Sequence, residues 1–188
     1  MAAAPPLSEF AAWVRLDRPG RDAASLEPID RGWLLRGAAA FEHEDGAAAV
    51  AYQVEVDARW RTKRGIVSGF LGAQTVQVEI LRDDAGWRLN GAAVEGLDHL
   101  VDLDFGFTPA TNVLQLSRIA LKPGQSAEVP VAWFDLDRAS WVELPQSYER
   151  FSETSYWYEA LTVPYRALLE IAPNGFVQSY PGLWRLVA

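Results

Sequence analysis

The fold is decided by one stretch, Asp102-Leu103-Asp104-Phe105-Gly106-Phe107-Thr108-Pro109-Ala110-Thr111-Asn112-Val113-Leu114, which runs on to Leu121. It joins the end of an alternating acidic and apolar strand to a helix start. The hydroxyl of Thr108 can accept a free backbone N–H as an N-cap, and proline is favoured at the first helical position. The spacing predicts a helix over about residues 109–121, ended by Lys122-Pro123-Gly124.

Strands are predicted on both sides of this stretch. Val50, Tyr52, Val54 and Val56 alternate with less apolar residues, which is the period of a strand with one buried face. Asn90-Gly91 is the preferred pair for a two-residue hairpin. About a dozen short strands at roughly ten-residue spacing indicate an all-β sandwich, barrel or roll. With a single short apolar helix among them, we expect a mainly β protein whose sheet wraps around that helix.

The chain of 188 residues is long enough for one sizeable core. No composition change marks a linker, so we predict a single domain over residues 1–188. The alanine- and proline-rich start, residues 1–8, is expected to be an extended or disordered tail.

Composition excludes several classes of function. A net charge of -8 argues against a nucleic-acid partner, because binding to phosphate backbones relies on clustered lysine and arginine. The chain has no cysteine and only two histidines, so neither a thiolate nor a histidine-based metal site is expected. No cofactor motif is present, and we expect no cofactor. No apolar run is long enough to span a membrane and no secretory signal is visible, which predicts a cytoplasmic protein.

The eight tryptophans are the unusual feature of the composition. Large aromatic side chains fill the cores of many β proteins. The functional alternative is that several of them line a cavity for an apolar or sugar ligand.

Motifs for nucleophilic catalysis are absent, since the chain has no Gly-x-Ser-x-Gly elbow. The best catalytic candidates are Asp102 and Asp104, because residues i and i+2 of a strand share a face at about 6–7 Å, near the carboxylate separation of glycoside hydrolases. The alternation can equally place both aspartates in water. A third possibility is structural, because Arg118 on an enclosed helix would need a carboxylate partner.

The central stretch from Asp102 to Asn112 resembles the signature of the bacterial family known as putative glycolipid-binding proteins. Further blocks follow in the order found in that family: Gly32-Trp33-x-Leu35-x-Gly37, Tyr52-x-Val54-x-Val56-Asp57-x-x-Trp60-x-Thr62, Gln146-x-Tyr148 and Gly175-Phe176-Val177-x-x-Tyr180-Pro181-Gly182-Leu183-Trp184. The resemblance implies a spiral β-roll, in which a many-stranded antiparallel sheet wraps around a single central helix. It also implies kinship of shape with bacterial lipoprotein carriers, whose curved sheets enclose acyl chains.

On this basis we expect a binding protein that holds an amphipathic glycolipid or lipid in an aromatic-lined roll, with no catalytic residues. The expected ligand-binding residues are Trp60, Asp102, Asp104, Asn112, Arg118, Tyr148 and Tyr180. Two alternatives stay open. One is a carboxylate-dependent hydrolase that acts on a sugar or ester through Asp102 and Asp104, and the other is a non-catalytic protein-interaction module.

Overall fold

A computed structural model describes residues 9–136 and 140–187, and the predicted tail, residues 1–8, lies outside the described residues. The described residues form seventeen strands and one helix. The strands are β1 (Glu9–Arg15), β2 (Gly20–Ile29), β3 (Gly32–His43), β4 (Gly46–Asp57), β5 (Thr62–Leu71), β6 (Gln74–Asp83), β7 (Gly86–Leu89), β8 (Ala92–Val94), β9 (Leu103–Phe105), β10 (Ser126–Glu128), β11 (Val131–Asp135), β12 (Ser140–Leu144), β13 (Gln146–Ser152), β14 (Ser155–Ala160), β15 (Tyr165–Ile171), β16 (Val177–Tyr180) and β17 (Trp184–Leu186). The helix is α1 (Asn112–Ile119).

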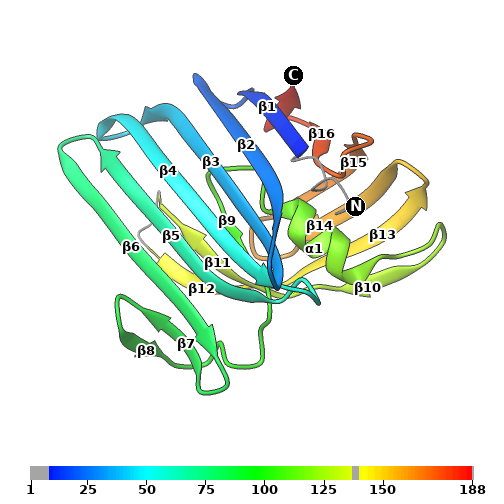
Figure 1. The fold of residues 1–188 in the computed structure, drawn as a ribbon. Helices are drawn as coiled ribbons and strands as arrows, with labels where there is room; N and C mark the ends of the chain where they lie inside the picture. The colour runs from blue at the N-terminus through cyan, green and yellow to red at the C-terminus, as the bar shows by residue number, and fades with distance from the viewer. Residues whose placement is uncertain (1–8, 137–139, 188) are drawn as a thin grey trace, which may run out of the picture.

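Fourteen strands form one sheet in the order β10-β13-β14-β15-β16-β17-β1-β2-β3-β4-β5-β6-β7-β8. The first and last strands, β1 and β17, pair with each other, so the sheet is continuous through the two ends of the chain. Its two outer strands, β10 and β8, do not meet, and the sheet curls without closing into a barrel. Figure 1 shows α1 in the space between the long strands β2–β6 and the strands β13–β15. The predicted mainly β fold with an antiparallel sheet around one helix is confirmed.

Local sequence explains the regular part of this sheet. In β4, the residues Ala48, Val50, Tyr52, Val54 and Val56 are buried, and the residues between them are more exposed, as the period of two predicts. At the β7–β8 hairpin, Asn90 and Gly91 have φ angles of 49° and 84°, the left-handed values that a type I′ turn requires.

A second sheet of three strands, which the sequence did not predict, lies inside the curl in the order β12-β11-β9. Strands β9 and β11 run parallel, with Asp104 opposite Trp133. One face of β9 packs against β5, where Gly65 has no side chain and a Cβ there would lie 2.5 Å from Leu103 Cδ2. This close approach is why the position requires glycine.

The helix is shorter at both ends than the predicted 109–121. Its N-cap is Thr111, which makes no side-chain capping bond. Its C-cap is Ala120, whose backbone is left-handed with φ 43° and ψ 43°. Thr108 is therefore not the N-cap. Its hydroxyl donates a hydrogen bond to the buried carboxylate of Asp22 and accepts one from the N–H of Ala110. Thr108 therefore stabilises a turn ahead of the helix. No helix among residues 9–136 and 140–187 has the length and apolar character needed to cross a membrane.

The helix is tied to the small sheet by an ion pair. Arg118 Nε donates to both carboxylate oxygens of Asp102 at 2.8 and 3.0 Å, and its Nη2 donates to Oδ2 at 2.6 Å. The structural reading of Arg118 is thereby confirmed, and the reading that places both aspartates in water is wrong, because Asp102 and Asp104 are both buried. Burial raises the pKa of Asp102, and the Arg118 guanidinium opposes that rise.

The two partners differ in burial, which predicts unequal effects of removing them. The Asp102 side chain is 2% exposed, whereas that of Arg118 is 26% exposed and can reach water. We expect Arg118→Leu to lower the free energy of unfolding by about 3 kcal/mol, because it leaves a buried carboxylate without its cation. Asp102→Asn should cost about 1 kcal/mol, because the arginine that remains is partly hydrated. Urea unfolding of both variants measures this difference, and equal costs would contradict the assignment.

Candidate functional site

A pocket of about 410 Å³ lies beside the entry of the helix. Its volume is in the range of small-molecule sites, about 300–1,000 Å³. Three parts of the chain supply its walls: the small sheet, the turn before α1, and the C-terminal strands of the large sheet. The lining residues are Arg18, Asp104, Phe105, Gly106, Thr108, Asn112, Trp133, Asp135, Leu144, Tyr158, Ala160, Val163, Tyr165, Tyr180, Leu183 and Trp184.

The small sheet divides the interior into a packed part and this pocket. Asp104 and Trp133 are opposite each other in the parallel pair, and Asp135 follows two residues after Trp133, so these side chains share one face. The alternate residues Leu103, Phe105 and Phe134 belong to the hydrophobic core. One face of β9 and β11 therefore directs Asp104, Trp133 and Asp135 to the pocket, and the other face packs into the core, with Phe105 also bordering the pocket.

Three tyrosines come from the C-terminal strands. The ring centroids of Tyr158, Tyr165 and Tyr180 lie 5.4–6.1 Å apart. Burial raises the pKa of each, that of Tyr165 to about 12, so the phenols stay protonated near neutral pH. The hydroxyl of Tyr158 donates to Gln146 Oε1 at 2.7 Å, and that of Tyr165 donates to the Pro181 carbonyl at 2.5 Å.

The turn before the helix is held by two buried carboxylates. Thr108 donates its hydroxyl to Asp22 of β2, and Tyr52 Oη donates to the same carboxylate at 2.9 Å. Thr111 donates its hydroxyl to Asp104 of β9 at 2.5 Å. Burial raises the pKa of both aspartates to about 6, and the hydrogen bonds from the threonines offset part of that rise.

A hydrogen-bonded network lies behind the pocket wall. Asn112 Nδ2 donates to Tyr148 Oη at 2.7 Å, and Tyr148 Oη donates to Gln115 Oε1 at 3.0 Å. Gln146 Nε2 donates to the same Gln115 oxygen at 3.0 Å. The network continues through Gln146 of β13 to Tyr158, and it fixes side chains that reach the pocket from α1 and β14.

The seven residues predicted to bind a ligand are only partly brought together. Asp104, Asn112 and Tyr180 line the pocket, and Tyr148 lies directly behind Asn112. Asp102 and Arg118 pair with each other, and neither is among the lining residues.

Trp60 is also outside the pocket. It lies in a turn, with a φ of 63°, and stacks on Trp33 at 4.9 Å between ring centroids. Its role in the structure is to pack against β3.

Asp102 and Asp104 do not form a catalytic pair in one cleft. Asp104 faces the pocket with a raised pKa, but Asp102 is bound by Arg118. An acid/base mechanism of glycoside hydrolysis needs both carboxyl groups at the scissile bond. The geometry therefore provides this pair with no such site.

Several lining residues were not predicted from the sequence, among them Trp133, Asp135, Tyr158 and Tyr165. The alternation of β14 and β15 predicts which tyrosines share a face, but not that this face borders a pocket. Asp135 lies near Asp104 only because β11 pairs with β9 in parallel register. No local signal in the sequence indicates that pairing.

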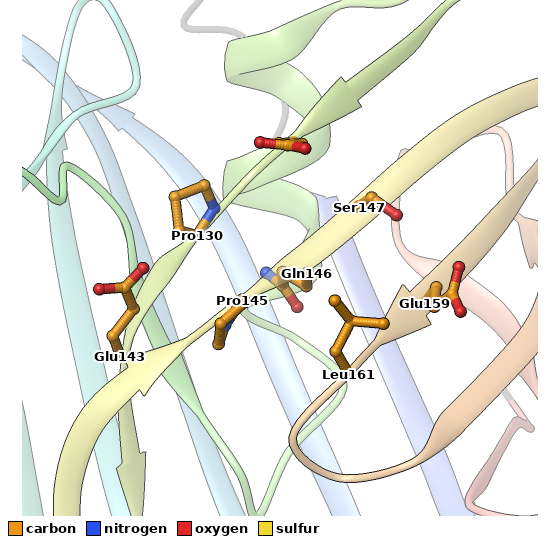
Figure 2. A pocket seen from close by; sticks show the side chains of 8 residues that line it. Pro130, Glu143, Pro145, Gln146, Ser147, Glu159 and Leu161 are labelled. Carbon is orange, nitrogen blue, oxygen red and sulfur yellow. The ribbon is translucent and has the colours of Figure 1, made fainter.

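A smaller pocket of about 250 Å³ lies on the other side of β13 and β14 (Figure 2). It carries the carboxylates of Glu128, Glu143 and Glu159. Its buried polar side chain, Gln146, uses its amide oxygen and nitrogen in the network already described. The larger pocket is therefore the better candidate site, because it combines buried polar groups with aromatic walls.

The raised pKa values predict a pH dependence of stability. For Asp22 and Asp104, the folded-state pKa of about 6 exceeds the unfolded value of 3.8. The folded state therefore binds the proton more tightly, and this stabilisation is present below pH 3.8 and lost as the pH rises through 6. We expect each group to contribute about 2–3 kcal/mol across that window.

The prediction is measured as the free energy of unfolding of the wild type and of Asp104→Asn between pH 4.5 and pH 7.5. The stability of the variant relative to the wild type should increase with pH, because asparagine does not ionise. A difference that stays constant over this range would contradict the raised pKa.

The chain can now be compared with known proteins. No curated protein matches it. Among solved structures, the crystal structure of a DUF1089 family protein from Pseudomonas aeruginosa superposes with a TM-score of 0.68. The two proteins are 24% identical over 97% of this chain and 93% of that chain, a likeness that establishes the shared fold. The model of the family described as "Putative glycolipid-binding" matches residues 10–186. The chain belongs to this family.

Proposed function

We propose that the protein binds an amphipathic small molecule, a glycolipid or related lipid, in the 410 Å³ pocket beside the helix entry. The observation that carries the proposal is the composition of the pocket walls. Buried polar groups, Asp104, Asn112 and Tyr180, meet aromatic and aliphatic side chains within one cavity. This combination of an apolar lining with a few fixed polar groups is typical of small-molecule sites.

The polar groups would hold the head group. They come from three elements, β9, α1 and β16, and their hydrogen bonds to the protein hold them in place without a ligand. Asn112 is positioned by Tyr148, and Asp104 by Thr111. Side chains that are already ordered lose little entropy when a ligand binds, which favours affinity.

The apolar part of the ligand would lie at the pocket mouth and not in the core. The space between the small sheet and β5 is filled by Leu103 and Phe105, both at most 1% exposed. Apolar surface is available instead on the lining residues Trp133, Val163 and Leu183. Val142, opposite Trp133 in the β11–β12 pair, is 45% exposed and extends this surface.

Extraction of the purified protein with organic solvent, followed by mass spectrometry, should recover a bound amphiphile. Val163→Trp should reduce the recovered amount at least about tenfold, because the indole would occupy the pocket mouth. Leu161→Trp is the matched control. Leu161 lies in the same β14–β15 turn, but it is 71% exposed and lines the smaller pocket instead.

The control variant should carry as much amphiphile as the wild type. Equal recovery from both tryptophan variants would place the ligand elsewhere. Protein that carries no amphiphile, and binds none added to it, would exclude the proposal.

A further inference from the structure

The direction of the hydrogen bonds around the pocket restricts the kind of head group that can enter. The starting point is Asp104, whose ionised carboxylate can only accept hydrogen bonds. The amide nitrogen of Gln115 opposes the rise of the Asp104 pKa but makes no regular hydrogen bond among the described residues. The oxygen of the same amide accepts from Gln146 Nε2 and Tyr148 Oη, and these two bonds set the orientation of Gln115.

That orientation fixes the rest of the network. Tyr148 Oη donates its one hydrogen to Gln115 Oε1 and has none left to donate elsewhere. Tyr148 then accepts the bond from Asn112 Nδ2. Asn112 lines the pocket and uses its amide nitrogen in this network. Its amide oxygen is therefore the group that it can offer to a ligand, as an acceptor.

Two tyrosines of the pocket also use their hydroxyl hydrogens in bonds to the protein. The hydroxyl of Tyr158 donates a hydrogen bond to Gln146 Oε1, and that of Tyr165 donates one to the Pro181 carbonyl. The ring of Tyr180 packs against that of Tyr158, with 5.7 Å between the ring centroids. Because a phenol has one proton and two lone pairs, the oxygens of Tyr158 and Tyr165 have mainly acceptor capacity left for a ligand.

The charges of the pocket act in the same direction. The carboxylates of Asp104 and Asp135 both line it. In the part of the chain that the structure describes, Arg18 is the only cation among the lining residues, and it lies 3.4 Å from the carboxylate of Asp17. An anionic head group would therefore lie close to the buried carboxylate of Asp104, which disfavours its binding.

We propose that the pocket selects ligands by hydrogen-bond donors on the head group, which Asp104 and Asn112 accept, and excludes head groups that carry phosphate or sulfate. This inference rests on the proposed function and adds the chemical class of the head group. Sugar hydroxyls supply such donors, and so does an ammonium group. Phosphate and sulfate esters would instead bring a further negative charge beside the carboxylate of Asp104.

The test compares three probes with the same eight-carbon chain below their micelle concentrations: octyl β-D-glucopyranoside, octylammonium chloride and octyl sulfate. Binding to the full chain at pH 7.5 is measured by calorimetry. We expect the glucoside or the ammonium probe to bind at least about tenfold more tightly than the sulfate, since one hydrogen bond to a charged group is worth about that factor or more. Which of the two binds more tightly identifies hydroxyl or ammonium as the donor.

Asp104→Asn should weaken binding of the preferred probe about tenfold and leave or improve binding of octyl sulfate. Asp102→Asn is the matched control, because Asp102 is also a buried carboxylate, lies two residues from Asp104, is bonded to Arg118 and does not line this pocket. It should bind the three probes as the wild type does. The wild-type ranking decides the question even where a variant does not fold.

Octyl sulfate binding as tightly as the other two probes would overturn the inference and leave the proposed function intact. An unchanged ranking in Asp104→Asn would also overturn the role of that carboxylate. Failure of all three probes to bind the wild type would instead count against the proposed function itself.

Discussion

Two buried carboxylates that need hydrogen-bond donors hold the centre of this protein together. An ionised carboxylate away from water is costly unless protein groups donate to it. Asp22 on β2 and Asp104 on β9 both receive threonine hydroxyls, and the two threonines, Thr108 and Thr111, belong to one turn. The turn is thereby fixed to the large sheet and to the small sheet at once. The start of α1, the floor of the pocket and the relative position of the two sheets all follow from it.

The small sheet explains how a curled, open sheet can have a filled interior and still retain a pocket. Its core-facing side chains approach β5 closely because Gly65 has no side chain. Within the large sheet, Gly37 of β3 likewise leaves room for the phenol of its neighbour Tyr52 on β4, which a Cβ would meet at 2.2 Å. Close packing on this side sets the small sheet against the long strands. The space on its other face, toward β14 and β16, remains open to a ligand.

Short-range sequence patterns predicted the strands and turns. The period of two in β4 and the Asn90-Gly91 hairpin were predicted correctly because they depend on neighbouring residues. The position of the helix start was not predicted correctly. It depends on Asp22, which lies 86 residues from Thr108 and accepts a hydrogen bond from its hydroxyl. Arg118 was assigned a carboxylate partner because burial of a guanidinium demands one.

The pocket could not be predicted either, because it also depends on contacts between residues far apart in the chain. Its polar wall depends on the parallel register of β9 and β11, and its tyrosine wall on strands that follow the helix in the chain. The resemblance to a family supplied the fold, but three of the seven residues suggested on that basis, Trp60, Asp102 and Arg118, have structural partners of their own. Composition and periodicity identify residues that are buried, and only tertiary pairing decides which of them face a cavity.

The contrast between Asp102 and Asp104 separates structural from ligand-binding roles within three residues of sequence. Asp102 has a guanidinium at 2.6 Å, which offsets part of the cost of its burial. Asp104 is also buried, but a threonine hydroxyl is its one regular side-chain donor among the described residues, and its pKa is raised to about 6. Near neutral pH it is ionised at a cost in stability that replacing it with a neutral residue would remove. Such uncompensated groups concentrate at functional sites, and here the group with this property faces the pocket.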